Sequence, residues 1–282
     1  MIVTGAAGQL GRDLLQHAAT SSTSSTDEVV GLTRADLDIG DRQAVMAAVS
    51  DIRPDAVVNA AAWTAVDACE SDPDRAFRDN AASVQHLAEA CEAVGAHLLQ
   101  LSTDYVFDGT LDRPYREDDA VNPISVYGES KLAGEEAAGE AATIVRTSWV
   151  CGVGGSNMVK TVLRLLALDV PMAFVTDQRG CPTFTSDLAP LVWQLAVERR
   201  AGVFHATNAG AVSWYEFVGD VVEAAGGDRG RVRPIITAEL QPPRPATRPA
   251  NSVLENAALA AAGIPLLGHY RRPLAELVAQ LT

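Results

Sequence analysis

The sequence has few cysteines, and they form no recognisable pattern. Cys69, Cys91, Cys151 and Cys181 are widely scattered, and no Cys-x-x-Cys pair occurs. Scattered cysteines are typical of free thiols in a reducing compartment, and they argue against a disulfide scaffold or a zinc finger. The five histidines are equally isolated, so we predict no metal ligand from the sequence.

The chain also lacks long apolar runs and an excess of positive charge. No uninterrupted apolar stretch approaches the ~18 residues of a transmembrane helix. The net charge is -14, and nucleic acids and anionic membranes both select basic patches, so neither is expected as a partner. The start at Met1 runs straight into fold-forming sequence and leaves no room for a signal peptide. We therefore expect a soluble, cytoplasmic protein.

What is present is enough for a substantial core, since 48% of the 282 residues are hydrophobic. Short apolar strands are predicted at 1–4, 28–33, 55–62, 96–102 and 142–150, and helices at 12–19, 41–50, 78–93 and from 125 onward, with a Ser/Thr-rich loop at 21–26. This alternation predicts an α/β fold with a doubly wound parallel, Rossmann-type sheet. Residues 1–150 should form the dinucleotide-binding domain, with part of 176–210 packing back on it. Residues 151–282 should form mainly a smaller C-terminal substrate-binding lobe.

A glycine-rich stretch follows the first predicted strand. Gly5, Gly8 and Gly11 have the spacing G-x-x-G-x-x-G and lead into a predicted helix. In a nucleotide-binding loop, the first glycine permits a tight turn, the second lets backbone approach a pyrophosphate, and the third allows close helix packing. The helix N-terminus adds unpaired N–H groups for the anion. We assign Gln9 and Leu10, between these glycines, to the same dinucleotide site.

The residues after the second predicted strand are expected to select the cofactor. A carboxylate there favours NAD, whereas an arginine can pair with the 2′-phosphate of NADP. Thr33 and Arg34 occupy this place, which favours NADP(H). Asp36 and Asp38 are close enough to keep NAD(H) open, and Asp38 with Ile39 is predicted to flank the adenine.

The third predicted strand ends in small residues that leave room for a dinucleotide lying across the sheet. These residues are Ala60, Ala61 and Ala62. Thr64 follows in a loop over that edge, and we assign it to the cofactor site. Trp63 is either a core residue or a wall of the ligand site. Asn80, inside a predicted helix, is also assigned to the cofactor, although a cap or a polar core residue is equally consistent with its position.

Three further residues form a candidate catalytic constellation. Tyr127 and Lys131 are four residues apart on a predicted helix, so their side chains lie on one face. A nearby ammonium is expected to lower the pKa of the phenol. Thr103 ends the fourth predicted strand, and its hydroxyl and the phenol together could polarise a carbonyl for hydride attack. Taken alone, a Tyr-x-x-x-Lys pair is also consistent with two exposed side chains on an amphipathic helix that have no catalytic role.

Together with the glycine loop, this constellation resembles the extended short-chain dehydrogenase/reductases that act on nucleotide sugars. The finer resemblance is to the dTDP-4-dehydrorhamnose reductase family. It is carried by AAWTAVD (61–67), STDYVFDG (102–109), YGESKLAGE (127–135), VRTSWV (145–150), DQRGCPT (177–183) and RPANS (248–252). The resemblance implies hydride transfer from NADPH or NADH to C4 of dTDP-4-dehydro-6-deoxy-L-mannose, giving dTDP-L-rhamnose. Tyr127 would donate a proton to O4, Lys131 would tune it and hold the nicotinamide ribose, and Thr103 would hold the carbonyl.

The resemblance also implies a substrate pocket. Asp104, Tyr105 and Val106 would line it, and Trp149 would lie near the sugar ring. Arg244 and Arg248 are candidates for binding the diphosphate, and of the two we assign Arg248 to the substrate site. The resemblance further allows a homodimer and a bound Mg2+, for which the sequence identifies no ligands.

Two departures from the family pattern lie on the predicted substrate side. Cys151 stands where relatives commonly have tyrosine, and His269-Tyr270 takes the place of a usual tryptophan. These differences leave open a reductase for another dTDP-4-keto-6-deoxy sugar.

Other functions within the same fold also stay open. A non-catalytic NADP(H)-binding regulatory subunit is one alternative, against which the intact Thr103, Tyr127 and Lys131 favour an enzyme. A 4-epimerase is not excluded by motif alone. A 4,6-dehydratase is disfavoured because the residue after Asp104 is Tyr105 and not glutamate.

Overall fold

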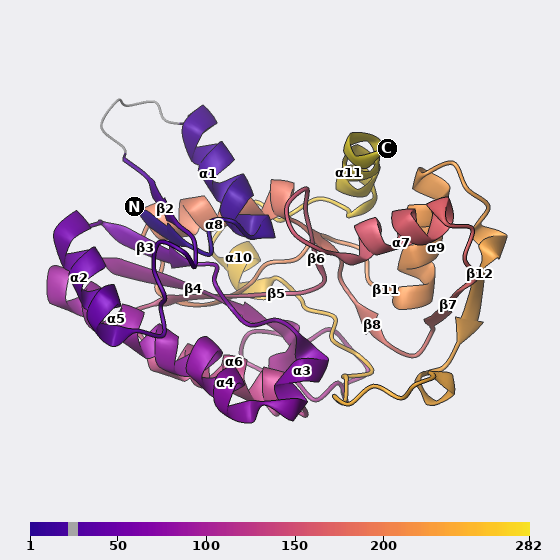
Figure 1. Cartoon of the computed structure of the whole chain (residues 1–282), viewed down its shortest axis with the longest axis horizontal. Helices are drawn as coiled ribbons and strands as arrows, with labels where there is room; N and C mark the ends of the chain where they lie inside the picture. Colours follow the sequence, from indigo (N-terminus) through magenta and orange to yellow (C-terminus); the bar gives the residue numbers. More distant parts are fainter. Residues whose placement is uncertain (22–27) are drawn as a thin grey trace.

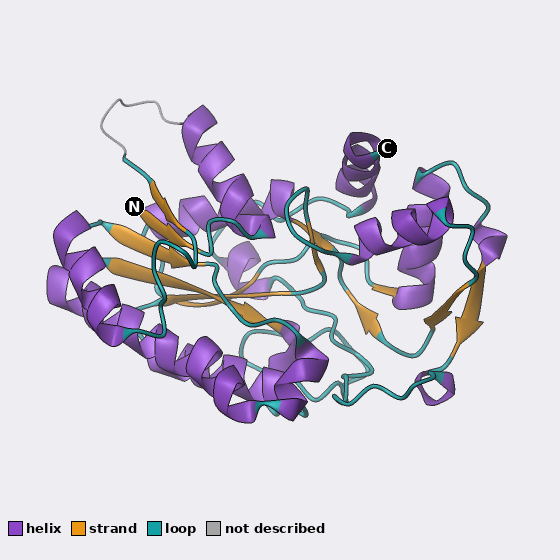
Figure 2. Ribbon diagram, viewed as in Figure 1, coloured by secondary structure: helices purple, strands orange, loops and turns teal. Residues whose placement is uncertain are grey.

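Six parallel strands form the central sheet of a larger, first lobe (Figures 1 and 2). The computed structural model describes residues 1–21 and 28–282. The strands are β1 (Ile2–Thr4), β2 (Val30–Leu32), β3 (Ala56–Asn59), β4 (His97–Thr103), β5 (Thr143–Thr147) and β10 (Gly202–His205), in the sheet order β10-β5-β4-β3-β1-β2. The chain moves outward from β1 to β2 and then crosses back to β3 on the other side of β1. The strand order therefore reverses beside β1, where doubly wound sheets bind ligands at the carboxyl ends of their strands.

Helices cover both faces of this sheet, as predicted for a doubly wound fold. One face carries α1 (Gln9–Ser21), α8 (Thr185–Val197) and α10 (Ala257–Ala261), and the other carries α2 (Arg42–Ile52), α5 (Ser83–Val94) and α6 (Val126–Ala138). Neighbouring strand residues point to opposite faces, so Val3 and Val58 belong to the first core while Ile2 and Val57 belong to the second. All four side chains are at most 1% exposed, which explains why the strands read as continuous apolar runs.

Short elements place the site residues at the carboxyl edge of the sheet. They are α3 (Val66–Ser71), α4 (Pro73–Phe77), the π-helix η1 (Arg78–Ala82) and the 3-10 helix η2 (Asp104–Val106). Ser125 is the N-cap of α6, because its Oγ accepts a hydrogen bond from the backbone N–H of Gly128 at 3.2 Å. This cap starts the helix at Val126 and places Tyr127 in its first turn.

A second lobe is built around its own core. It contains the parallel pair β7 (Met172–Val175) and β12 (Val232–Ile235), covered by α7 (Met158–Ala167), α9 (Trp214–Ala224) and α11 (Arg271–Leu281). Short elements complete it and connect it to the sheet: β6 (Val150–Cys151), β8 (Arg179–Gly180), β9 (Thr183–Phe184), β11 (Val212–Ser213), η3 (Arg229–Arg231) and η4 (Thr237–Glu239). Figure 1 shows this lobe at the opposite end of the long axis from the sheet edge at β2.

The chain crosses between the two lobes more than once. The segment that contains α8 and β10 returns to the sheet, within the predicted range of 176–210. Leu259 and Ile264 also belong to the first core, so the C-terminal part contributes more to this lobe than the sequence suggested. Most of the predicted Ser/Thr-rich loop at 21–26 lies outside the described residues, apart from Ser21 at the end of α1. Within the described ranges, no helix is both long and apolar enough to cross a membrane.

Candidate active site

The glycine loop has the close backbone contacts that its spacing predicts. Gly5 has φ +67°, and a Cβ there would lie 2.7 Å from backbone atoms of Ala60 and Ala61 at the end of β3. A Cβ on Gly11 would lie 2.3 Å from the carbonyl oxygen of Gly5. Gly8 is exposed, and a Cβ there would meet only that same oxygen, at 3.0 Å. The loop therefore presents open backbone at Gly8 at the start of α1.

We expect Gly11→Ala to destabilise the first lobe by about 1–3 kcal/mol, because both nearest atoms are backbone and cannot move aside without shifting the loop. Affinity for a dinucleotide should fall as well, since the same shift displaces Gly5 and Gly8. Chemical denaturation and a dinucleotide titration measure the two effects. Gly268→Ala is the matched control, because a Cβ at Gly268 meets nothing within 4 Å. Equal stability of the two variants would contradict the packing role of Gly11.

A cavity of about 290 Å³ lies over the glycine loop and the ends of β2 and β3. Nine of the predicted cofactor-binding residues line it: Gly5, Gly8, Thr33, Arg34, Asp38, Ile39, Ala60, Ala61 and Ala62. Trp63 also lines the cavity, which agrees with the second of its two predicted positions, a wall of the ligand site. The remaining lining residues were not predicted from the sequence: Thr4, Ala7, Leu37, Gly40 and Asp79. Exposed glycine backbone, small strand-end residues and a helix N-terminus along one wall fit the adenosine and pyrophosphate parts of a dinucleotide.

Some side chains at the end of β2 already have hydrogen-bonding partners within the protein, and others do not need to give one up to bind a ligand. Asp36 accepts hydrogen bonds from the backbone N–H and the hydroxyl of Thr33, at 2.9 and 2.6 Å, and the hydroxyl contact lowers the pKa of this carboxyl. Asp38 lines the cavity and accepts a hydrogen bond from the backbone N–H of Gly40 at 3.0 Å. Arg34 is an exposed cation at the cavity wall. The arrangement favours an anion, such as a 2′-phosphate, beside Arg34.

The other residues predicted to bind the cofactor lie outside this cavity. The side chain of Leu10 packs in the first core at 7% exposure, so its predicted place in the dinucleotide site concerns its backbone. Gln9 reaches across to the second lobe, where its Oε1 accepts hydrogen bonds from the Gly152 N–H at 2.9 Å and from Asn157 at 2.8 Å. Thr64 is exposed in the loop after β3.

The side chain of Asn80 forms hydrogen bonds within the protein. Its side-chain oxygen accepts a hydrogen bond from the backbone N–H of Trp63 at 2.8 Å, and its amide nitrogen donates to the hydroxyl of Ser130 at 3.0 Å. It is only 1% exposed. Asn80 is therefore a polar core residue, one of the positions that the sequence left open. Its side chain connects the loop after β3 to α6.

Tyr127 lies between the cavity and the second lobe. It forms a small cluster with Cys69 and Ala76, against which Trp63 and Tyr105 pack. Trp63 lines the first cavity, and the ring of Tyr105 lies edge-on to Tyr127 with centroids 5.8 Å apart. Burial raises the pKa of Tyr127 above its ordinary value, so the phenol stays protonated at neutral pH.

Thr103 connects this phenol to a buried carboxyl. Its hydroxyl is hydrogen-bonded to the phenol of Tyr127 and donates to Oδ1 of Asp104 at 2.9 Å. A threonine hydroxyl has one proton, so Thr103 can donate either to Asp104, as it does in this structure, or to the oxygen of Tyr127. Burial raises the pKa of Asp104 to about 7, so this carboxyl changes charge near neutral pH. The predicted meeting of Thr103 and Tyr127 is therefore present, with Asp104 as a third member.

Lys131 does not act on Tyr127 as predicted. It lies one turn along α6 and is buried, but its Nζ donates to the backbone carbonyl of Leu101 at 2.7 Å. Burial lowers the pKa of Lys131 to about 8, partly opposed by the charge of Glu135. Because desolvation outweighs any attraction from the ammonium, the prediction of a lowered phenol pKa is wrong. The helical spacing was predicted correctly, but it did not reveal how deeply either side chain is buried.

A buried ion pair that was not predicted from the sequence lies behind Lys131. Glu135 lies one further turn along α6 and accepts hydrogen bonds from Arg146 of β5, through Nη2 at 2.7 Å and Nε at 2.9 Å. The hydroxyl of Ser102, at the end of β4, donates to the same carboxylate. Both charged side chains are at most 7% exposed. Glu135 stands in a quoted motif, but its partner on β5 is visible only in the folded structure.

A second cavity of about 270 Å³ lies in the second lobe, next to Tyr105. Its lining combines an apolar floor with two guanidinium groups. The lining residues are Tyr105, Met158, Ala173, Phe174, Val175, Gln178, Trp214, Leu240, Arg244 and Arg248. Aromatic and aliphatic walls with two cations fit an aromatic base that carries phosphate groups. Thr103, Tyr127 and Lys131 line neither cavity and are each at most 9% exposed.

Two residues predicted to contact the substrate are placed differently. The side chain of Val106 is completely buried in a cluster with Phe107 and Tyr115, so its predicted place in the substrate pocket concerns its backbone. Trp149 has φ +47°, and its indole stacks on that of Trp214 with centroids 3.6 Å apart. Trp214 lines the second cavity, so Trp149 lies behind this wall.

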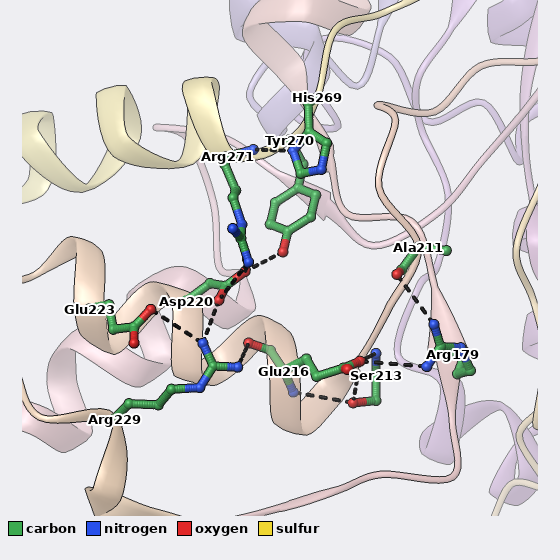
Figure 3. Close-up of polar contacts among 10 residues, drawn as sticks. All are labelled: Arg179, Ala211, Ser213, Glu216, Asp220, Glu223, Arg229, His269, Tyr270 and Arg271. Carbon is green, nitrogen blue, oxygen red and sulfur yellow. Dashed lines mark hydrogen bonds and ion pairs between the residues drawn. The ribbon is translucent and has the colours of Figure 1, made fainter.

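At the two departures from the family pattern, Cys151 and Tyr270 lie inside the second core, whereas His269 is exposed, and none of the three lines either cavity. Cys151 is 2% exposed, and burial raises the pKa of its thiol to about 12. Tyr270 is 1% exposed and donates a hydrogen bond to Asp220, which is also paired with Arg229 at 2.7 Å and Arg271 at 3.1 Å (Figure 3). Both departures therefore lie in the second lobe, the predicted substrate side, but behind its cavity lining. Tyr270 instead helps to fasten α11 to α9.

The Mg2+ that the resemblance allowed has no support in the part of the chain that is described. No group of three or more His, Cys, Asp or Glu side chains among residues 1–21 and 28–282 is arranged to hold a metal ion.

Comparisons with known proteins agree with this geometry. A family model described as RmlD substrate binding domain matches residues 1–282. A dTDP-4-dehydrorhamnose reductase from Streptomyces griseus is 46% identical over 284 residues, covering 98% of this chain and 91% of that protein. A dTDP-4-keto-6-deoxy-D-glucose reductase from Streptomyces niveus is 39% identical, covering 98% and 95%. A crystal structure of dTDP-4-dehydrorhamnose reductase from Bacillus anthracis in complex with NADP is similar with a TM-score of 0.93 and 34% identity, covering 99% of this chain and 98% of that one.

Proposed function

The chain belongs to the RmlD substrate binding domain family, and on this premise we propose that it is an NADPH-dependent dTDP-4-dehydrorhamnose reductase. It would reduce the C4 keto group of dTDP-4-dehydro-6-deoxy-L-mannose to give dTDP-L-rhamnose. The observation that carries the proposal is the position of Tyr127. One neighbour of this buried phenol lines the cavity over the glycine loop, and the other lines the cavity with two arginines.

The first cavity would hold the dinucleotide. Gly8 offers open backbone to a pyrophosphate, Gly5 makes the turn that places it, and Ala60 to Ala62 leave room above the end of β3. Arg34 supports NADPH over NADH, because it can pair with a 2′-phosphate, while Asp36 is already occupied by Thr33. When bound, the dinucleotide supplies the hydride.

The protein's own groups would handle the proton. Tyr127 is kept protonated by burial, so it can donate to the oxygen that was the ketone. Thr103 can donate to the same oxygen once its hydroxyl turns away from Asp104. Protonation of Asp104 makes this easier, because a neutral carboxyl is a weaker hydrogen-bond acceptor than a carboxylate. Lys131, with a pKa of about 8, carries a positive charge at neutral pH close to this group. We propose that it binds the nicotinamide ribose, as the family resemblance implies.

The second cavity would hold the nucleotide part of the substrate. Phe174, Trp214 and Leu240 offer an apolar surface for the thymine, and the cavity wall that carries Arg244 and Arg248 is the side suited to the diphosphate. By the family resemblance, Tyr105 and Trp149 would lie on the side toward the sugar, with Trp149 supporting the cavity wall through its stack on Trp214. A homodimer and a cytoplasmic location stay predictions, to be checked by the solution mass and by cell fractionation.

The proposal is tested with purified protein, dTDP-4-keto-6-deoxy sugars and each reduced nicotinamide. We expect NADPH oxidation that depends on the sugar, with NADPH used faster than NADH. The assay should include the keto sugars of both the L-manno and D-gluco series, because one 39% identical relative is a dTDP-4-keto-6-deoxy-D-glucose reductase. NADPH binding without oxidation on any of these sugars would contradict the enzyme and favour a regulatory subunit.

A further inference from the structure

A cross-lobe ion pair lies at the wall of the second cavity. Asp67, in the first turn of α3, accepts hydrogen bonds from both terminal nitrogens of Arg248, at 2.9 and 2.8 Å. Arg248 belongs to a segment that runs from the second lobe back along the first, and we name residues 244–254 the C-terminal strap. The backbone N–H of Ala246 in the strap donates to the same carboxylate at 3.3 Å. Asp67 and Arg248 are 181 positions apart in sequence, so this contact fastens distant parts of the chain.

Most of the hydrogen-bonding capacity of Arg248 is already used. A guanidinium has five N–H donors. Two of them are directed to Asp67, a third goes from Nη1 to the carbonyl of Ala246 at 2.9 Å, and the group is also hydrogen-bonded to the hydroxyl of Tyr105. Its side chain is only 16% exposed. A diphosphate can therefore gain little from Arg248 unless the pair with Asp67 is broken.

Arg244 lines the same cavity under different constraints. Its side chain is 58% exposed, and its one contact with Asp67 is long, at 3.4 Å. An exposed contact of this kind is weak and exchanges readily. Arg244 can therefore turn toward an anion in the cavity without giving up a strong partner.

We propose that the two arginines have different tasks. Arg244 binds the diphosphate of the nucleotide, whereas Arg248 is a positioning residue, and Asp67 holds it. The inference rests on the proposed function and replaces the assignment of Arg248 to the substrate with a positioning role. By holding the hydroxyl of Tyr105, Arg248 fixes the ring that lies edge-on to the phenol of Tyr127. Losing the pair should therefore disturb turnover more than nucleotide binding.

The test compares Arg244→Gln, Arg248→Gln and Asp67→Asn, using dTDP itself as the binding probe in calorimetry and the keto sugar in turnover assays. We expect Arg244→Gln to raise the Kd for dTDP roughly 10- to 100-fold and to change kcat less than about 3-fold, as for lost charge-assisted hydrogen bonds. Asp67→Asn should lower kcat about 10-fold without raising the Kd for dTDP. Arg248→Gln should lower kcat to a similar extent and raise the Kd less than Arg244→Gln does.

A double variant and a control sharpen the comparison. Asp67→Asn combined with Arg248→Gln should be no worse than the worse single variant, because both remove the same pair. Arg42→Gln is the matched control for Arg244, since Arg42 is also 58% exposed and pairs with Glu89 on the far helices. It should leave the Kd for dTDP unchanged.

The opposite ranking would overturn the inference. If Arg248→Gln raised the Kd for dTDP more than Arg244→Gln, Arg248 would be the diphosphate ligand. A wild-type protein that binds no dTDP would instead contradict the proposed substrate class, so the two failures are distinguishable. Thermal unfolding of each variant separates lost binding from lost folding, and Arg244→Gln is expected to melt like the wild type because of its exposure.

Discussion

Tyr127→Phe should lower kcat by roughly 10²–10⁴-fold while leaving the Kd for NADPH close to the wild-type value. The range is typical of lost general acid catalysis, because phenylalanine keeps the ring but has no proton to donate. The ring packs with Cys69 and Ala76, and those contacts are retained in the variant. Steady-state turnover with the keto sugar and a direct NADPH titration give the two quantities.

Tyr215→Phe is the matched control for this experiment. Tyr215 lies on α9, lines neither cavity and should tolerate loss of its hydroxyl with unchanged turnover. Retention of more than a third of the wild-type kcat by Tyr127→Phe would remove the phenol from its proposed role. A comparable loss in both variants would point to a general effect on folding.

Arg146→Met should destabilise the protein by about 3–5 kcal/mol, the usual cost of removing one partner of a buried ion pair. The pair is 5% and 7% exposed, so Glu135 would keep a buried charge with only the hydroxyl of Ser102 as a remaining donor. Methionine fills a similar volume and can pack on Phe107, over which the guanidinium lies at 5.2 Å. Urea denaturation monitored by circular dichroism measures the change.

The double variant Glu135→Gln with Arg146→Met separates charge from packing. It removes both charges, so most of the lost stability should return if the unpaired carboxylate is the cause. Arg113→Met is the surface control, because Arg113 forms a two-point pair with Asp119 but is 49% exposed. It should cost less than about 1 kcal/mol. A loss of that size at Arg146 as well would mean that the buried pair contributes no more than an exposed one.

The local features of the first lobe could be predicted from the sequence. The glycine spacing gave the turn at Gly5 and the close approach at Gly11, and the strand and helix periodicity gave the doubly wound sheet. Tyr127 and Lys131 lie one turn apart on α6, as their spacing required. These features depend on neighbours within a few residues or on a repeating pattern, so the sequence carries them directly.

The tertiary structure alone decided which charges are paired and which groups are buried. Lys131 donates to a backbone carbonyl on β4, Asp67 pairs with Arg248 across 181 positions, and Glu135 meets Arg146 on a different strand. A pKa depends on desolvation and on the charges that folding brings near. The pKa of Tyr127 is therefore raised, where the helical spacing predicted that it would be lowered, and the pKa of Lys131 is lowered by a burial that the spacing did not reveal. The sequence by itself determined the glycine loop and the order of the candidate catalytic residues. Packing of the two lobes decided which of these residues remains able to contact a ligand, because burial and pairing are set by distant parts of the chain.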